Sequence, residues 1–222
     1  MKSLRYYYKK IVRPYGKCHF LSTYVGKKQA KILDVGCGNN SVRLVKRNCP
    51  DCYYIGVDVG DYNLAEELKK QMDEYHVVTA ENFADKIREV GADMDVVISA
   101  HNIEHCNEPL KVLKNMIMSL KRGGHLYLAF PTENSVEFPH RDGTLNFYDD
   151  PTHIWCPKWN EIMKILAENN VQIDYACKNH TSFLLRTVGR FNERKSKYEK
   201  KVLRGTWEYY GFESIIWGTL RE

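Results

Sequence analysis

The chain of 222 residues is 43% hydrophobic and 27% charged, which is typical of a soluble globular protein. No apolar run approaches the roughly 18 residues that a membrane-spanning helix needs, and no apolar stretch follows the basic first ten residues, so we expect neither a transmembrane segment nor a secretory signal. The seven scattered cysteines, an odd number, favour reduced thiols in a cytoplasmic protein. The length suits one α/β core rather than two, so we expect a single domain over residues 1–222.

The net charge of +5 is unevenly distributed along the chain. Residues 1–31 hold nine Lys or Arg and no Asp or Glu, and residues 186–204 hold eight basic against two acidic side chains. The remaining chain is therefore acidic. Basic flanks of this kind suit a phosphate-bearing acceptor, peripheral contact with an anionic membrane, or nucleic acid. The alternative is that both are solvated helical faces without a partner.

Residues 1–30 predict a basic N-terminal extension of helix and loop, interrupted at Pro14 and Gly16. From Lys31 onward, short apolar runs alternate with helical patterns. Strands are expected at 32–35, 53–59, 76–79, 96–99 and 126–130, the last entered through a Gly123-Gly124 turn. Between the last two strands, one helical face carries Leu110, Leu113, Met116, Ile117 and Leu120.

The pattern continues after Trp159 with a helix, a strand at 171–177, a basic-aromatic insert at 178–210 and a last strand at 213–220. Strand–helix–strand units at this spacing predict an α/β fold with a doubly wound, mostly parallel sheet covered by helices on both faces. The N-terminal helical extension and the insert before the last strand are additions to that fold.

The segment ILDVGCGNN, residues 32–40, carries the strongest chemical signal. A strand brings Asp34 to the carboxyl edge of the sheet, and Gly36 and Gly38 let the backbone turn tightly and approach a ligand. Asp58 ends the next strand, where a carboxylate can accept hydrogen bonds from both ribose hydroxyls. Ser41 replaces the third glycine of the dinucleotide fingerprint, which favours S-adenosylmethionine over a nicotinamide cofactor.

Five ordered segments, ILDVGCGNN, GVDV, TAENFAD, DMDVVISAHNIEHCNEP and LKRGGHLYLAFPTE, resemble those of Rossmann-like class I methyltransferases over roughly residues 30–177. The resemblance implies that Asp34, Gly36 and Gly38 surround the methionine portion of S-adenosylmethionine. It implies that Asp58 holds the ribose and that Glu81 and Asn82 flank the adenine. The remaining expected cofactor contacts are Cys37, Val59, Ala100 and His101.

The segment SAHNIEH places His101, Glu104 and His105 at i, i+3 and i+4, so one helical turn would present all three on one face to a divalent metal. It resembles the Glu-x-x-Glu-His site of small-RNA 2′-O-methyltransferases and quinone-ring O-methyltransferases, with His101 in place of the first glutamate. That resemblance implies one more histidine, for which His153 fits better by position than His140. The expected metal ligands are thus His101, Glu104, His105 and His153.

A metal-free alternative exists, because the I-E-H segment is also similar to methyltransferases in which the histidine lies near the acceptor as a base. His105 is then the first catalytic candidate, followed by His153 and His140. A hydroxyl acceptor must lose its proton near the transition state, so the histidines favour an oxygen acceptor.

The basic-aromatic insert resembles, loosely, inserts of bacterial methyltransferases that act on surface polysaccharides and their precursors. We therefore expect a glycan or nucleotide-sugar hydroxyl as acceptor, within the wider class of small-molecule O-methyltransferases. The alternatives are an RNA 2′-O-methyltransferase with a His/Glu metal site, since basic and aromatic residues also suit single-stranded RNA, and a non-catalytic cofactor-binding scaffold.

Overall fold

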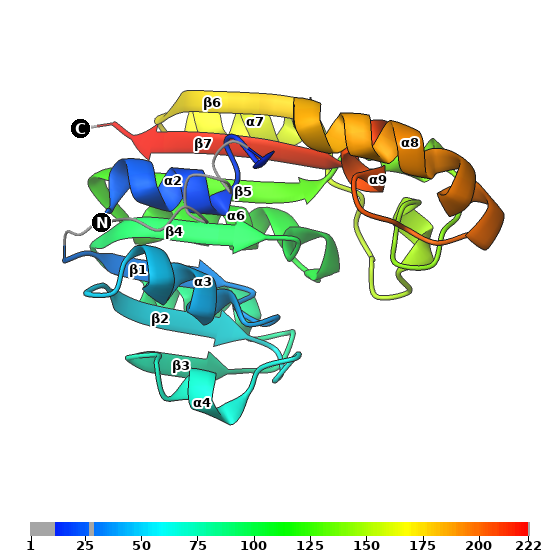
Figure 1. Ribbon diagram of the computed structural model, residues 1–222. Helices are drawn as coiled ribbons and strands as arrows, with labels where there is room; N and C mark the ends of the chain where they lie inside the picture. The colour runs from blue at the N-terminus through cyan, green and yellow to red at the C-terminus, as the bar shows by residue number, and fades with distance from the viewer. Residues whose placement is uncertain (1–11, 27–28, 222) are drawn as a thin grey trace.

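The computed structural model describes residues 12–26 and 29–221. Seven strands form one sheet in the order β3-β2-β1-β4-β5-β7-β6 (Figure 1). The strands are β1 (Lys31–Val35), β2 (Tyr53–Asp58), β3 (Glu74–Val77), β4 (Met94–Ala100), β5 (Leu120–Pro131), β6 (Val171–His180) and β7 (Glu213–Leu220). The pairs β3-β2, β2-β1, β1-β4 and β4-β5 are parallel, which confirms the expected doubly wound, mostly parallel α/β fold.

The last strand runs against its neighbours. β7 inserts between β5 and β6 and pairs antiparallel with both. The expected turn at Gly123-Gly124 is instead part of β5, which begins at Leu120; the register against β4 shifts between Met94 and Val96, so the glycines lie at an irregularity within the strand. Leu120 accordingly leaves the predicted helix, which ends one residue earlier.

Two helical layers cover the sheet, each with its own apolar core (Figure 1). One core joins the sheet to α2 (Lys17–Tyr24), α3 (Ser41–Asn48) and α4 (Glu66–Lys69). The other joins it to α5 (Phe83–Val90), α6 (Pro109–Ser119) and α7 (Trp159–Glu168). The strands β1, β2 and β4 are buried almost throughout because both of their faces are covered.

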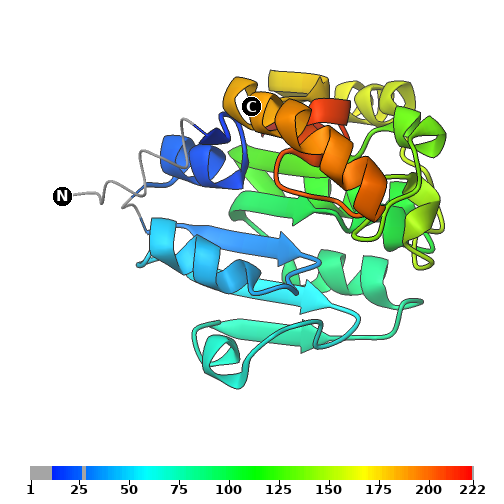
Figure 2. The same ribbon diagram turned by 45° about the vertical axis from the view of Figure 1, so that its right-hand side comes forward.

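Loops and short helices gather at the carboxyl edge of the parallel strands. They include η1 (Ile103–His105), η2 (Glu133–Glu137) and η3 (Phe147–Asp149). Between β6 and β7 the chain forms α8 (Phe183–Glu199) and α9 (Thr206–Tyr210), which cross above this edge (Figure 2). No helix among the described residues is long and apolar enough to cross a membrane. All seven cysteines are free thiols.

Candidate functional site

The glycine loop after β1 has a backbone that only glycine adopts easily. Gly36 has φ +74° and donates its N–H to the carbonyl of Val57, 2.9 Å away. A Cβ on Gly36 would lie 2.4 Å from Oδ1 of Asn102, which follows β4. The loop is therefore held against the ends of both neighbouring strands, and Asn102 fills the space that a side chain at position 36 would need.

Asp58 organises the same loop from the end of β2. Its Oδ2 accepts the Gly38 N–H and its Oδ1 accepts the Val59 N–H, both at 2.8 Å. Burial raises the pKa of Asp58, and backbone N–H donors from Gly38, Val59 and Gly60 offset part of that rise. Each oxygen keeps a lone pair that can accept a ribose hydroxyl.

Asp34 lies deeper than its motif position suggests. Its side chain is fully buried, and its Oδ2 accepts hydrogen bonds from Ser41 Oγ at 2.5 Å and Tyr54 Oη at 2.7 Å. Lys17 Nζ lies 4.0 Å from Asp34 Oδ1 and donates to Ser41 Oγ. Asp34 thus ties the start of α3 to β2 and to the N-terminal segment.

The other expected cofactor positions surround this loop. Cys37 is fully buried, and that burial raises the pKa of its thiol well above the usual range. Glu81 and Asn82 are exposed before α5, and Val59 is exposed beside Asp58. Asp58 pairs with Val77 at the end of β3, so the exposed Glu81 and Asn82 follow the strand next to Asp58.

His101 ends up between two carboxylates rather than on a shared ligand face. Its φ is +51°, its Nε2 lies 3.0 Å from Glu213 Oε1, and its Nδ1 lies 3.3 Å from Glu104 Oε1. Burial disfavours the charged ring, but the interactions with Glu104 and Glu213 outweigh it and raise the pKa of His101 to about 10. A doubly protonated imidazole has no lone pair for a metal.

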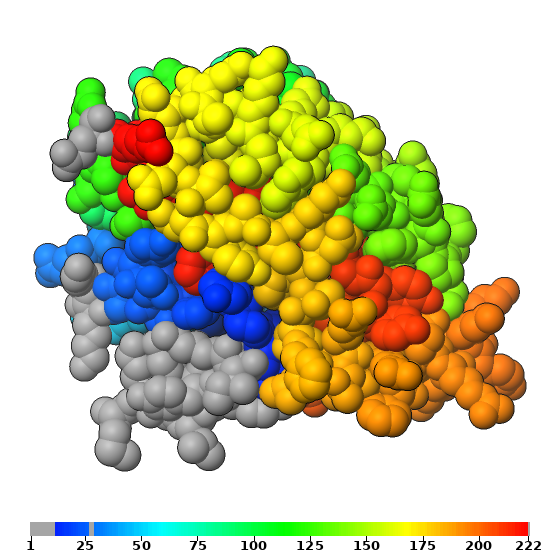
Figure 3. Space-filling view, turned by 90° about the horizontal axis from the view of Figure 1, so that it is seen from above, coloured from blue at the N-terminus to red at the C-terminus, as the bar shows by residue number. Residues whose placement is uncertain are grey.

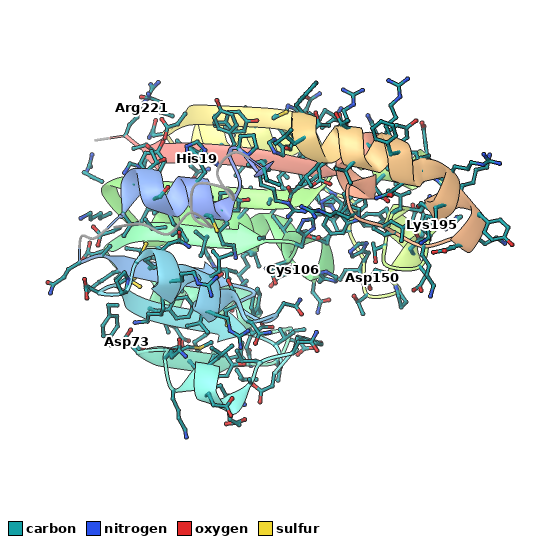
Figure 4. The ribbon with its side chains drawn as sticks, viewed as in Figure 1. His19, Asp73, Cys106, Asp150, Lys195 and Arg221 are labelled. Atoms are coloured by element: carbon teal, nitrogen blue, oxygen red, sulfur yellow. The ribbon has the colours of Figure 1, made fainter. Side chains whose placement is uncertain are left out.

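Glu104, His105 and His153 come together, with one ligand atom from each lying within 4.8 Å of the others. The Glu104 side chain is fully buried, and neither of its carboxylate oxygens accepts a hydrogen bond from the described residues. Cys106 and Asp150 lie close to this group in the sequence. In Figure 4 both labelled residues are at the end of the sheet toward which β1 to β5 run, and Asp73 is at the other end.

Both imidazoles of this group are held by their Nδ1 atoms. His153 Nδ1 donates to the Phe147 carbonyl at 2.6 Å, and His105 Nδ1 faces the Thr152 carbonyl at 3.1 Å and its hydroxyl at 2.9 Å. The Nε2 atoms are left as lone-pair donors, the arrangement typical of metal-binding histidines. The structure does not bring His140 here: it is exposed and its Nδ1 lies 2.6 Å from Asp149 Oδ1.

A cavity of about 410 Å³ opens at the end of β4, and none of its lining residues belongs to the glycine loop. Its walls come from the N-terminal segment, the end of β4, α9, and strands β5 to β7. Aromatic and acidic side chains meet there: the Trp207 ring lies 5.2 Å from the His101 ring, and Arg13 Nη2 lies 3.1 Å from Glu208 Oε1. Sequence reasoning did not single out Trp207, Glu208 or Glu213, because only the folded chain brings them to the end of β4.

The comparisons with known proteins agree with this geometry. A family model described as a methyltransferase domain matches residues 33–126. The ubiquinone biosynthesis O-methyltransferase of Pseudomonas fluorescens (strain Pf-5) is 28% identical over 125 residues, which cover 53% of this chain and 51% of that protein. The chain therefore spans about half the length of the curated relatives it matches.

Solved structures show the same architecture. A SAM-dependent methyltransferase from Archaeoglobus fulgidus has a TM-score of 0.55 and 16% identity, covering 98% of this chain and 100% of that one. Phosphoethanolamine N-methyltransferase 2 of Haemonchus contortus, in complex with S-adenosyl-L-methionine, has a TM-score of 0.59 and 17% identity, covering 91% and 51%. The sheet order and glycine loop thus define a Rossmann-like fold of the kind found in these methyltransferases. The match to a methyltransferase-domain model over residues 33–126 adds sequence similarity to that shared fold.

Proposed function

We propose that this protein is an S-adenosylmethionine-dependent O-methyltransferase whose acceptor is a hydroxyl of a sugar, glycan or nucleotide sugar. S-adenosylmethionine supplies an activated methyl group on a sulfonium. Gly36 and Gly38 would hold its methionine portion by close backbone approach, and Asp58 would accept the two ribose hydroxyls. Glu81 and Asn82 would flank the adenine, and Val59, Ala100 and His101 would border the remaining cofactor surface, whereas Cys37 is fully buried and has no surface for it.

The proposal of an oxygen acceptor rests on the surroundings of the buried Glu104 carboxylate. A buried carboxylate is costly unless cationic groups balance it; His101, 3.3 Å from Glu104 Oε1, supplies one, and both Glu104 oxygens still lack a hydrogen bond from the described residues. Glu104 faces two imidazoles whose Nε2 atoms have no hydrogen bond from the described residues, and His153 Nε2 lies 4.0 Å from Asp150 Oδ2. We infer that Glu104, His105 and His153 hold a divalent cation, without His101 from the sequence-based ligand set. Such a cation would lower the pKa of a bound hydroxyl.

The residues themselves do the positioning. The backbone carbonyls of Thr152 and Phe147 fix the two imidazole rings, so the acceptor oxygen would meet a rigid group. In the absence of a cation, His105 Nε2 is the atom that would take the hydroxyl proton, with His153 beside it at 4.8 Å between ring centroids. His140 has no part in this proposal because it lies apart from both rings.

The sugar acceptor is supported by the cavity at the end of β4, which Ala100 and His101 of the expected cofactor contacts also line. Trp207 offers an indole face for a pyranose ring, and Glu208 and Glu213 offer carboxylate oxygens that can accept sugar hydroxyls. Arg13, which pairs with Glu208 at 3.1 Å, and Lys17 add cationic groups to the same cavity, which suits a phosphate-bearing sugar. A phenolic hydroxyl is the second candidate, because the curated relatives are ubiquinone biosynthesis O-methyltransferases.

The test is a transfer assay with methyl-labelled cofactor across nucleotide sugars, free sugars, phenols and RNA ends. His105→Ala should lower kcat by about 10²–10⁴ while leaving S-adenosylmethionine affinity unchanged. His140→Ala is the matched control, since it removes an exposed histidine elsewhere, and should retain turnover. Elemental analysis should find a divalent metal that His153→Ala loses.

Each contrary result has a distinct meaning. Preferred transfer to a phenol or to an RNA 2′-hydroxyl would overturn the sugar acceptor. Full turnover and full metal content in His105→Ala and His153→Ala would remove both residues from the mechanism. A protein that releases no heat with S-adenosylmethionine would be a scaffold and no enzyme.

A further inference from the structure

Three large aromatic side chains stand almost fully in solvent along α8. Phe183 is 82% exposed, Phe191 81% and Tyr198 89%. With 3.6 residues per turn, positions seven or eight apart fall on the same side of a helix, so the three rings share one face. Leu184, 46% exposed, borders it. A contiguous exposed apolar surface of this kind marks an interaction site more often than scattered single residues do.

The same face is basic and contains no acid. Arg190, Arg194 and Lys197 alternate with the aromatic rings, and none of them forms an ion pair with a described residue of the chain. The two acidic residues of α8 point elsewhere. Glu193 accepts a hydrogen bond from Tyr210 Oη at 2.7 Å, and Glu199 lies 3.7 Å from Lys195 Nζ. Unpaired positive charge therefore surrounds exposed rings.

The opposite side of α8 is fixed to the body of the protein. Leu185, Gly189 and Ser196 are buried, and a Cβ on Gly189 would lie 2.0 Å from the Gly205 carbonyl oxygen before α9. Because Gly189 approaches the backbone before α9 so closely, α8 packs against α9 along its buried side, and its aromatic face points away from the body of the protein. In Figure 1 and Figure 3 the orange α8 forms a ridge at the periphery of the molecule.

We propose that this outer face of α8 docks on the surface of an anionic lipid bilayer. A helix with Lys and Arg among aromatic and aliphatic side chains, fixed flat on a protein surface, has the composition of an interfacial helix: the rings enter the headgroup region and the cations meet lipid phosphates. Single-stranded RNA is less suited to it, because proteins bind RNA of this kind in a basic groove, and α8 presents a convex ridge.

Docking would bring the cavity close to the lipid surface. His180 lines that cavity and lies three residues before α8 begins, and Trp207 and Glu208 of α9 line it from the element packed against α8. This step rests on the proposed function: a cavity held near a bilayer favours an acceptor whose sugar is attached to a lipid.

The experiment is co-sedimentation of the full chain with vesicles of phosphatidylcholine alone or mixed with phosphatidylglycerol. The wild-type protein should bind the mixed vesicles and release them as salt rises. Arg190→Gln with Arg194→Gln should weaken binding about 25-fold, at about fivefold per arginine. Phe191→Ala with Tyr198→Ala should abolish binding at every salt concentration. All four side chains are exposed, so these variants should fold normally.

The matched control is Lys114→Gln with Met118→Ala, which removes an exposed cation and an exposed apolar side chain from α6; it should bind like wild type. Equal binding to neutral vesicles, no vesicle binding, or binding of a single-stranded oligonucleotide in its place would overturn the docking proposal. Methyl transfer to a soluble acceptor, measured on the same proteins, separates the two proposals. If the wild-type protein transfers methyl groups but does not bind vesicles, the docking proposal alone is overturned. If it binds vesicles but transfers no methyl group, the proposed enzymatic function alone is overturned.

Discussion

Replacing Asp58 with alanine removes the side chain that would hold the ribose of S-adenosylmethionine. Each Asp58 oxygen accepts one backbone N–H and has a lone pair left for one hydroxyl. Two charge-assisted hydrogen bonds of about 1.5–3 kcal/mol each make a loss of about 3–6 kcal/mol, which weakens Kd about 10²–10⁴-fold. Isothermal titration calorimetry with S-adenosylmethionine and its demethylated product measures this directly.

Asp61→Ala is the matched control for this experiment. Asp61 lies three residues further along the same loop, is exposed, and pairs with Lys69 and Tyr75 rather than with the glycine loop. We expect its affinity for the cofactor to stay within a factor of about five of the wild type, since an exposed ion pair contributes up to about 1 kcal/mol. Equal losses in both variants, or an unchanged Kd in Asp58→Ala, would refute the assignment of Asp58 to the ribose.

Three further predictions address the loop, its charge and the histidine group. Gly36→Ala should lower the unfolding free energy, measured in urea, by about 2–5 kcal/mol, because it adds left-handed backbone strain and a collision with Asn102. The control is Gly123→Ala, at φ +72° with no atom within 4 Å, which should lose only the energy of the backbone strain. Equal losses in the two variants would contradict the collision. Because the pKa of Asp58 is raised, its carboxylate should take up a proton, and cofactor affinity should fall, at a higher pH than for an ordinary aspartate. The same raised pKa means that Asp58 adds stability to the cofactor-free protein as pH falls. A cofactor affinity that stays constant down to pH about 4 would contradict this prediction. Chelation should lower both turnover and the unfolding temperature, and zinc or manganese should restore both, without changing cofactor affinity; a chelated protein with full turnover would exclude the cation.

The strands and the cofactor loop could be predicted from the sequence because their signals are local. Apolar runs of four to seven residues mark strands that are buried on both faces, and a glycine loop follows the first of them. The direction of β7 could not be predicted, since a strand of eight residues reads the same either way. Its insertion between β5 and β6 depends on pairing across the whole sheet.

The histidine group was predictable in part. The spacing of His101, Glu104 and His105 assumes a regular helical turn, but the chain forms a 3-10 turn after a left-handed His101. That geometry sends His101 to Glu213, 112 residues later, and leaves Glu104 with His105 and His153. No local pattern in the sequence announces a partner so distant. Lys17, which reaches Asp34 through Ser41, is hidden for the same reason.

The proposed donor and acceptor sites lie in different parts of the chain. The family match covers residues 33–126, which include the glycine loop and Asp58. Of the residues that line the cavity, all but Leu44, Ala100 and His101 lie outside that range. The part of the chain that resembles known methyltransferases is therefore the part that would bind the methyl donor. The surface that would select the acceptor is built by the N-terminal segment and by α9 and β7, so the aromatic and acidic groups of this chain, more than the substrates of its relatives, should guide the acceptor screen.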